Sequence, residues 1–173
     1  MKPRSFVTRK VYPQAVAILQ EDCVVDYRDT LEVADPETLR KKLQHADGVV
    51  CQLTDAMTDE LMAAAPKLKV ISQVAVGYDN IDVAAATRRG IVVTNTPGVL
   101  TESTADLTFA LLLGVARRVT EAERYLRAGK WKRWDIDLLA GIDLSGKTLG
   151  IGGMGRIGKA VARRARGFSM RIL

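Results

Sequence analysis

The chain has 173 residues, of which 47% are hydrophobic, and its 26 basic and 20 acidic residues give a net charge of +6 at pH 7. This length and composition predict a globular protein of one domain, or of one domain and part of another, and exclude a disordered chain. The longest nearly unbroken apolar run, residues 107–116, is about half of the roughly 20 residues that a membrane-spanning helix needs. No apolar run of signal-peptide length follows the charged N-terminus, so we expect a cytoplasmic protein that does not bind membranes.

The charge is distributed unevenly along the chain. Up to Ala116 there are 12 basic and 15 acidic residues, whereas from Arg117 onward there are 14 and 5. A basic segment of this kind can bind nucleic acid. Its arginines, however, recur at helical spacing and have few aromatic residues among them, so we expect no nucleic-acid partner.

Cysteine and histidine are too sparse to indicate a metal site or a disulfide framework. Cys23 and Cys51 each lie in a short apolar run, which is typical of buried packing residues. His45 is the only histidine, and no cysteine or histidine stands within ligand spacing of another. We therefore expect no metal.

In the first hundred residues, short runs rich in β-branched residues alternate with helical patterns, which predicts βαβ units and a parallel sheet. The predicted strands cover residues 6–8, 23–25, 48–51, 70–74 and 91–93. The predicted helices cover residues 12–19, 36–43, 58–65 and 81–89. Asp35 before Pro36 predicts an N-cap, and Gly90 predicts a helix end. Together these elements predict one open, doubly wound α/β unit that ends at the turn of residues 95–98.

Beyond this turn the pattern changes. A long helix is predicted over residues 103–128, and because residues 107–116 are apolar on all sides, we expect more than one of its faces to be buried, at a domain junction or a subunit interface. Trp131 and Trp134 fall in a predicted loop. A strand over residues 147–151, a glycine-rich turn, a helix over residues 156–166 and the start of a strand at residues 170–173 follow.

These last elements predict only the beginning of a second sheet. Parallel strands need several neighbours and cover on both faces, so one strand and part of another cannot form a sheet alone. We therefore expect the chain to be a fragment, or a partner to supply the rest.

The glycine-rich turn has the pattern G-x-G-x-x-G, formed by Gly153, Gly155 and Gly158. Between a strand and a helix this pattern predicts a dinucleotide site: the first glycine makes the tight turn, the second lets the backbone approach a pyrophosphate, and the third lets helix pack on strand. The free N–H groups of the helix N-terminus then face the anion. The alternative is a tight turn that binds nothing. The acidic residue that would distinguish NAD from NADP, about 20 positions later, lies beyond the sequence.

From about Val49 to its end, the sequence resembles the D-2-hydroxyacid dehydrogenases, and within them the glyoxylate/hydroxypyruvate reductases. The motifs that carry the resemblance are residues 53–55, 74–82, 94–101, 103–107 and 141–150, followed by the glycine-rich turn. The resemblance implies a flavodoxin-like substrate domain over residues 1–98 and the N-terminal part of a Rossmann NAD(P)-binding domain over residues 99–173. It also implies a homodimer through the helix of residues 103–128.

The resemblance further implies roles for particular residues. The backbone amides of Val76 and Gly77 would hold the substrate carboxylate, and Leu53 would line the same pocket. Thr104 would contact the nicotinamide end of the cofactor. Arg156 and Ile157 would cover the pyrophosphate beside the three glycines. Each residue also has a structural alternative. Gly77 would be a turn glycine, and Leu53 an ordinary packing residue. Thr104 would hydrogen-bond the backbone in the first turn of its helix, and Arg156 would be a solvated helix arginine.

The family's catalytic arginine, glutamate and histidine follow the Rossmann turn, and none is present here, so they are expected downstream of Leu173. We therefore expect an intact protein that reduces a small 2-keto acid, glyoxylate or hydroxypyruvate, with NADH or NADPH. The 173-residue chain alone is expected to be inactive. Two alternatives stay open: a phosphoglycerate dehydrogenase-like enzyme, and a non-catalytic binding or dimerisation module.

Two residues depart from the family's pattern. Gly152 stands where a branched apolar residue of the Rossmann strand is usual, and loss of a buried side chain there is expected to cost about 1–3 kcal/mol. Ser169 replaces a common glycine.

Overall fold

The computed structural model describes residues 1–173, which divide into two compact units, Met1–Pro97 and Gly98–Leu173. Each unit has its own cluster of buried apolar side chains. None of the seven helices combines the length and the hydropathy that a membrane span requires.

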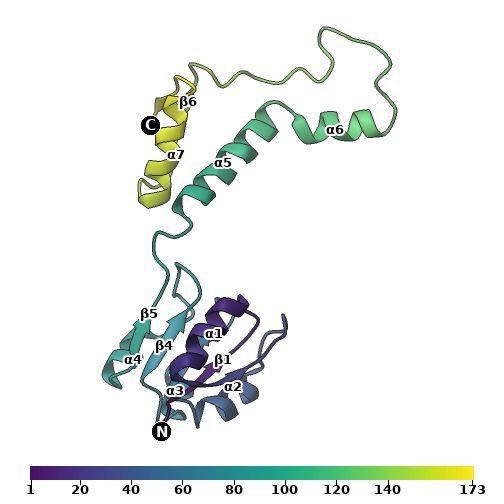
Figure 1. The fold of residues 1–173 in the computed structure, drawn as a ribbon. Helices are drawn as coiled ribbons and strands as arrows, with labels where there is room; N and C mark the ends of the chain where they lie inside the picture. The colour runs from purple at the N-terminus through teal and green to yellow at the C-terminus, as the bar shows by residue number, and fades with distance from the viewer. The chain divides into compact units, whose positions relative to one another are not determined.

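The first unit contains a five-stranded parallel sheet with the strand order β2-β1-β3-β4-β5, the order of a flavodoxin-like doubly wound fold (Figure 1). This confirms the predicted fold class. The strands are β1 (Arg4–Val7), β2 (Val24–Tyr27), β3 (Gly48–Cys51), β4 (Val70–Gln73) and β5 (Val92–Thr94). All five predicted strands are present, with ends shifted by at most two residues.

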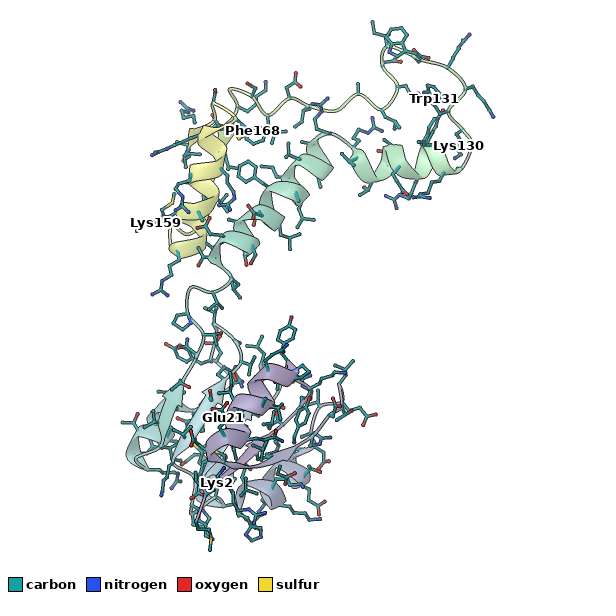
Figure 2. All side chains as sticks on the ribbon, viewed as in Figure 1. Lys2, Glu21, Lys130, Trp131, Lys159 and Phe168 are labelled. Atoms are coloured by element: carbon teal, nitrogen blue, oxygen red, sulfur yellow. The ribbon has the colours of Figure 1, made fainter.

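Four helices connect these strands: α1 (Pro13–Asp22), α2 (Pro36–Leu43), α3 (Asp59–Ala63) and α4 (Val83–Arg88). The predicted end signals are confirmed. The Asp35 side chain accepts a hydrogen bond from the Thr38 N–H at the start of α2. Gly90 follows α4 with φ +69°, a left-handed conformation that glycine adopts without a steric penalty. The start of β1 is tied to the end of α1, because the Lys2 Nζ donates to the Glu21 carbonyl at 2.6 Å (Figure 2).

The two faces of this sheet differ in their cover. Successive side chains of a strand point to opposite faces. On one face Val49, Cys51 and Ile71 are buried in the cluster that also contains side chains from α2, α3 and α4. On the other face Val74 and Val92 remain 46% and 56% exposed. Within this unit the second face is thus only partly covered.

The second unit contains α5 (Thr101–Ala116), α6 (Val119–Arg127), β6 (Thr148–Leu149), α7 (Arg156–Arg166) and β7 (Arg171–Ile172). β6 and β7 pair in parallel, and α5 packs along α7 (Figure 1). The core lies between these two helices, where Phe109 of α5 stacks on Phe168 with ring centroids 5.4 Å apart. Figure 2 labels Phe168 at the end of α7. The segment of Trp131 and Trp134 is a loop, as predicted.

The predicted single helix over residues 103–128 is wrong, because the chain forms two helices with a break at Arg118. Arg118 has φ +54°, which ends α5 and redirects the chain into α6. The Ala116 carbonyl accepts the Ile142 N–H at 2.9 Å instead of a donor from a following helical turn. A returning segment far away in the sequence therefore stabilises the break.

Two expectations about the second unit concern burial. Leu107, Leu111 and Val115 of α5 are 59%, 62% and 80% exposed, so only one face of α5 is buried within this chain, and burial of a second face at a subunit interface stays a prediction. Gly152 lies in an exposed bend and not in a strand, and a Cβ there would meet nothing within 4 Å. The expected loss of a buried side chain at Gly152 is therefore wrong for this chain.

Candidate functional site

In the first unit, the loops that follow β3 and β4 meet at the carboxyl edge of the sheet. Parallel α/β sheets bind ligands at this edge. The structure brings Leu53 and Gly77 together, because Leu53 Cδ2 lies 3.9 Å from where a Gly77 Cβ would stand. Leu53 is 60% exposed, so it is not an ordinary packing residue of the unit's core. Val76, next to Gly77, is half-buried.

Neither folding nor packing requires a glycine at position 77. Its φ lies outside the left-handed region, and a Cβ would make only ordinary contacts, 3.9 Å from Leu53 and 4.0 Å from Asp79. A glycine without such a requirement only adds conformational entropy to the unfolded chain. Close approach of another group to the backbone would account for it.

The loop after β4 presents free hydrogen-bond donors. The N–H groups of Val76, Gly77 and Tyr78 donate to no acceptor within the chain. Next to this loop a cavity of about 340 Å³ opens between the loops after β1, β3 and β4, with Gln52 and Val74 in its wall. Successive free backbone N–H groups are suited to bind an anion such as a carboxylate.

A network of side-chain hydrogen bonds supports this loop. The Gln73 Nε2 donates to the Gly77 carbonyl at 3.2 Å and to the Asn80 Oδ1 at 2.7 Å. The Asn80 Nδ2 in turn donates to the carbonyls of Gln52 and Asp55, at 3.1 and 2.8 Å. The loop of Leu53 and the loop of Gly77 are thus joined by two side-chain amides.

Cys51 and Asp55 complete the buried network. The Cys51 thiol donates to the Gln73 Oε1 at 3.1 Å, and burial, reinforced by the Asp55 charge, raises the pKa of this thiol to about 12, so it stays protonated. The Asp55 carboxylate is fully buried and accepts the Thr8 hydroxyl at 2.6 Å and the Gln52 N–H at 2.8 Å.

Sequence reasoning gave no role to Thr8, Cys51, Gln73 or Asn80 in supporting this loop. One signal was available, because Thr8 directly follows β1, and Gln73 ends β4. Polar side chains at the carboxyl ends of parallel strands face the region where ligands bind.

In the second unit, the three glycines of the turn before α7 have three different environments. Gly153 has φ +102°, which favours glycine. A Cβ at Gly155 would meet nothing within 4 Å, so this position is open to solvent. A Cβ at Gly158 would lie well within 3.0 Å of the Gly153 carbonyl oxygen, so only glycine lets α7 pack on the turn. The tight turn at Gly153 and the close packing at Gly158 are the environments that the pattern predicts, and the approach of a pyrophosphate to Gly155 stays a prediction.

The N-terminus of α7 is free to bind an anion. Its N-cap is Gly155, no side chain caps it, and its first turn has no acidic residue. The N–H groups of Arg156, Ile157 and Gly158 donate to no acceptor within the chain. The Arg156 side chain is exposed, whereas that of Ile157 packs against the unit's core, so Ile157 offers only its backbone. The positive end of the helix dipole adds to the attraction for an anion.

Thr104 lies in the first turn of α5, and its side chain is half-buried. Its hydroxyl makes no hydrogen bond within the chain, although its carbonyl accepts the Thr108 hydroxyl at 2.8 Å. α5 and α7 run side by side in the same direction, since Glu102 contacts Arg163 and Phe109 contacts Phe168 (Figure 1). The N-termini of both helices therefore lie at the same end of this unit.

Two arginines of α7 fix the start of α5. Arg164 donates to the Glu102 Oε2 at 2.9 Å and to Asp106, and Arg163 donates to the Glu102 Oε1 at 2.6 Å. The hydrogen bonds from Arg164 and Arg163 lower the pKa of the Glu102 carboxyl. The hydrogen bonds that Arg164 donates to Asp106 and Glu102 raise the pKa of Arg164. The carboxylates of Glu102 and Asp106 are exposed to solvent, so the main effect of these ion pairs is to set the register of the two helices.

His45 lies far from the Gly77 loop. It is exposed in the segment before β3, at the amino edge of the sheet, whereas Gly77 lies at the carboxyl edge. β3 is four residues long, so its first and last Cα atoms are about 10 Å apart. No group of three or more His, Cys, Asp or Glu side chains is arranged to hold a metal ion.

The comparisons with known proteins agree on one family. Residues 5–168 match the family described as D-isomer specific 2-hydroxyacid dehydrogenase, catalytic domain. A glyoxylate reductase from Korarchaeum cryptofilum is 53% identical over the whole chain, which covers 52% of that protein. The chain thus spans about half the length of the curated relatives it matches.

Solved structures show the same similarity. The TT0316 protein from Thermus thermophilus is 48% identical with a TM-score of 0.90, and the match covers 98% of this chain and 54% of that one. An NADPH-dependent glyoxylate/hydroxypyruvate reductase from Sinorhizobium meliloti, solved with NADP and malonate, is 36% identical with a TM-score of 0.80; the match covers 99% of this chain and 52% of that one.

Proposed function

Since the chain belongs to the D-isomer specific 2-hydroxyacid dehydrogenase family, we propose that it forms the substrate-binding part and the first cofactor-binding part of an enzyme that reduces a small 2-keto acid. Glyoxylate and hydroxypyruvate are the substrates we favour, because two of the relatives named above are a glyoxylate reductase and a glyoxylate/hydroxypyruvate reductase. In this proposal residues 1–98 are the substrate domain and residues 99–173 are the N-terminal part of a Rossmann domain.

The observation that carries the proposal is the pair of glycines that folding does not require. A Cβ at Gly77 or at Gly155 would meet no obstacle, and each glycine stands beside backbone N–H groups without partners. We assign the N–H groups of Val76 and Gly77 to the substrate carboxylate. Leu53, beside Gly77, would bound the space for the substrate's carbon chain.

The second glycine belongs to the proposed cofactor site. The N–H groups at the start of α7 would hold the pyrophosphate of NAD or NADP, with Arg156 as a nearby cation. The free hydroxyl of Thr104 would hydrogen-bond the nicotinamide end. When bound, the reduced cofactor supplies the hydride that reduces the substrate's carbonyl carbon.

The chain's own residues bind and orient the substrate but do not supply the proton that completes the reaction. A general acid must lie within hydrogen-bond reach of the substrate oxygen. His45, the only histidine, lies at the opposite edge of the sheet from Gly77. We therefore propose that the 173-residue chain, assayed by itself, binds its ligands without turnover.

We also propose that the chain forms a homodimer through α5 and α6. Leu107, Leu111 and Val115 form an exposed apolar row on α5, and Leu126 of α6 is 62% exposed. Burial of such side chains against a second copy would remove them from water. Sedimentation of the wild type and of a Leu111→Glu variant tests this: a dimer that the variant dissociates supports the interface, and a wild-type monomer contradicts it.

A non-catalytic binding or dimerisation module is the second candidate, favoured by the position of His45. A phosphoglycerate dehydrogenase-like enzyme would use the same two sites. Turnover by the native protein with glyoxylate, hydroxypyruvate and 3-phosphoglycerate distinguishes the three readings, since the module alone would show none.

The binding test uses matched glycine variants of the 173-residue chain. Gly77→Ala is expected to fold normally and to weaken binding of oxamate, an unreactive analogue of a 2-keto acid, measured by amide NMR shifts. Gly48→Ala is the control, because its Cβ would also make only an ordinary contact, 3.7 Å from Val70, but at the amino edge of β3. Equal oxamate affinity in both variants, or no shift of the Val76 and Gly77 amides, would overturn the assignment.

For the cofactor, Gly155→Ala is expected to weaken NADPH binding, and Gly150→Ala is the control, because a Cβ at either position would meet nothing. NADPH fluorescence measures the affinity. Unchanged affinity in a folded Gly155→Ala variant would contradict a pyrophosphate site at the start of α7.

A further inference from the structure

The loop after β4 has three successive carbonyls that are each held by a hydrogen bond from another part of the first unit. The Ala75 carbonyl accepts the Thr96 N–H at 2.9 Å, and the Val76 carbonyl accepts the Asn95 Nδ2 at 2.8 Å. The Gly77 carbonyl accepts the Gln73 Nε2 at 3.2 Å. The loop belongs to no helix or strand, so these bonds replace a regular ladder.

The held carbonyls determine where the free N–H groups point. In a trans peptide the C=O of one residue and the N–H of the next lie in one plane and point in opposite directions, and the structure contains no cis peptide. Fixing the Val76 carbonyl therefore fixes the Gly77 N–H. Fixing the Gly77 carbonyl fixes the Tyr78 N–H in the same way.

Resting on the proposed function, we propose that Asn95 and Gln73 are positioning residues for substrate binding: Asn95 orients the Gly77 N–H that is assigned to the substrate carboxylate, and Gln73 fixes the peptide that follows, and neither side chain touches the substrate. Asn95 sets the Gly77 N–H, and Gln73 sets the Tyr78 N–H. Each acts through the carbonyl on the other side of the same peptide plane.

The surroundings of Gln73 hold its amide in one orientation. Its Oε1 accepts the Cys51 thiol, and its Nε2 also donates to the Asn80 Oδ1. The raised pKa of Cys51 keeps the thiol proton in place as the donor. A flipped Gln73 amide would place an oxygen against the Gly77 carbonyl and the Asn80 Oδ1, which burial makes unfavourable.

Asn95 has the same effect from a different strand. It directly follows β5, and its side chain is half-buried, so a substitution is expected to leave the fold intact. Gln73 is 1% exposed, so its variants could fail to fold, and the test therefore begins with Asn95.

The test combines a direct measurement of N–H direction with a measurement of binding. Residual dipolar couplings of the ¹⁵N-labelled 173-residue chain report the direction of the Gly77 and Val76 N–H groups. In Asn95→Ala the Gly77 coupling is expected to change, whereas the Val76 coupling, held through Thr96, stays. Asn95→Asp, which keeps the shape but loses the donor, is expected to behave like Asn95→Ala.

Oxamate titration of the same samples measures the consequence. Both Asn95 variants lose the hydrogen bond that orients the Gly77 N–H. This loss is expected to raise the dissociation constant of oxamate about fivefold. Thr94→Ala is the control, because the Thr94 hydroxyl donates to Ser72 at 3.2 Å from the neighbouring position of β5 and does not contact the loop. This control is expected to change neither readout.

Each outcome decides a different point. An unchanged Gly77 coupling in Asn95→Ala, or a changed coupling with unchanged oxamate affinity, overturns the positioning role. If oxamate does not shift the amide signals of Val76 and Gly77 in the wild type, the proposed carboxylate site is overturned. The role of Asn95 and Gln73 in substrate binding is then overturned as well. The dipolar couplings then still show whether Asn95 fixes the Gly77 N–H.

Discussion

Replacing Gly158 by alanine is expected to destabilise the second unit, because α7 packs directly on the turn before it. The new Cβ would lie well within 3.0 Å of the Gly153 carbonyl oxygen and 3.2 Å from its carbon. Both are backbone atoms of a residue at φ +102°, so they cannot move aside like the end of a flexible side chain. Forcing a methyl group into such a contact costs about 1–3 kcal/mol. Alanine's better helix propensity offsets at most about 1 kcal/mol.

At the upper end of this cost the net loss is about 2 kcal/mol, which corresponds to a fall in Tm of roughly 8–16 °C for a unit of this size. Thermal unfolding of the 173-residue chain, followed by far-ultraviolet circular dichroism, measures it. Gly150→Ala is the matched control, because it adds the same methyl group with nothing within 4 Å. If both variants unfold at the same temperature, the close packing of α7 on the turn is refuted, and with it the explanation of the third glycine.

Three further changes test other features. Ser169, at φ +53°, is strained for a residue with a side chain, so Ser169→Gly is expected to raise the unfolding free energy by about 1 kcal/mol in urea denaturation; no gain would contradict the strain. The Glu102 pKa is lowered in the folded state. The ionised Glu102 carboxylate therefore adds to the free energy of unfolding above the ordinary glutamate pKa, and this stabilisation is lost as the pH falls through the lowered pKa. Arg164→Met is expected to flatten this acid dependence of stability, and an unchanged acid unfolding curve would argue against the pairing. Asp55→Ala leaves the buried Thr8 hydroxyl without its acceptor and is expected to cost about 1–3 kcal/mol, measured by the same denaturation; a neutral effect would show that the buried network is dispensable.

The sequence alone determined the order and type of nearly all the elements. The bounds of α2 and α7 agree with the prediction to the residue, because a proline with an Asp35 N-cap and a glycine-rich turn specify those starts locally. Short apolar runs likewise located all five strands of the first sheet. A strand that is buried on one face has alternating apolar residues, and a strand that is buried on both faces has a continuous apolar run.

The break between α5 and α6 could not be predicted in this way. Local propensity favours a continuous helix through Arg117 and Arg118. The break depends on the Ile142 N–H, which reaches the Ala116 carbonyl from a segment that returns after a loop. The exposure of Gly152 likewise depends on where β6 ends.

The candidate sites divide in the same way. The environments of Gly153, Gly155 and Gly158 depend on spacing within one turn, so the sequence pattern could predict them. The support of the Gly77 loop depends instead on pairs far apart in the chain: Thr8 and Asp55 are 47 positions apart, and Asn95 and Val76 are 19 apart. A hydrogen bond between segments that follow different strands leaves no period in the sequence, so only the register of the folded sheet decides which polar groups meet.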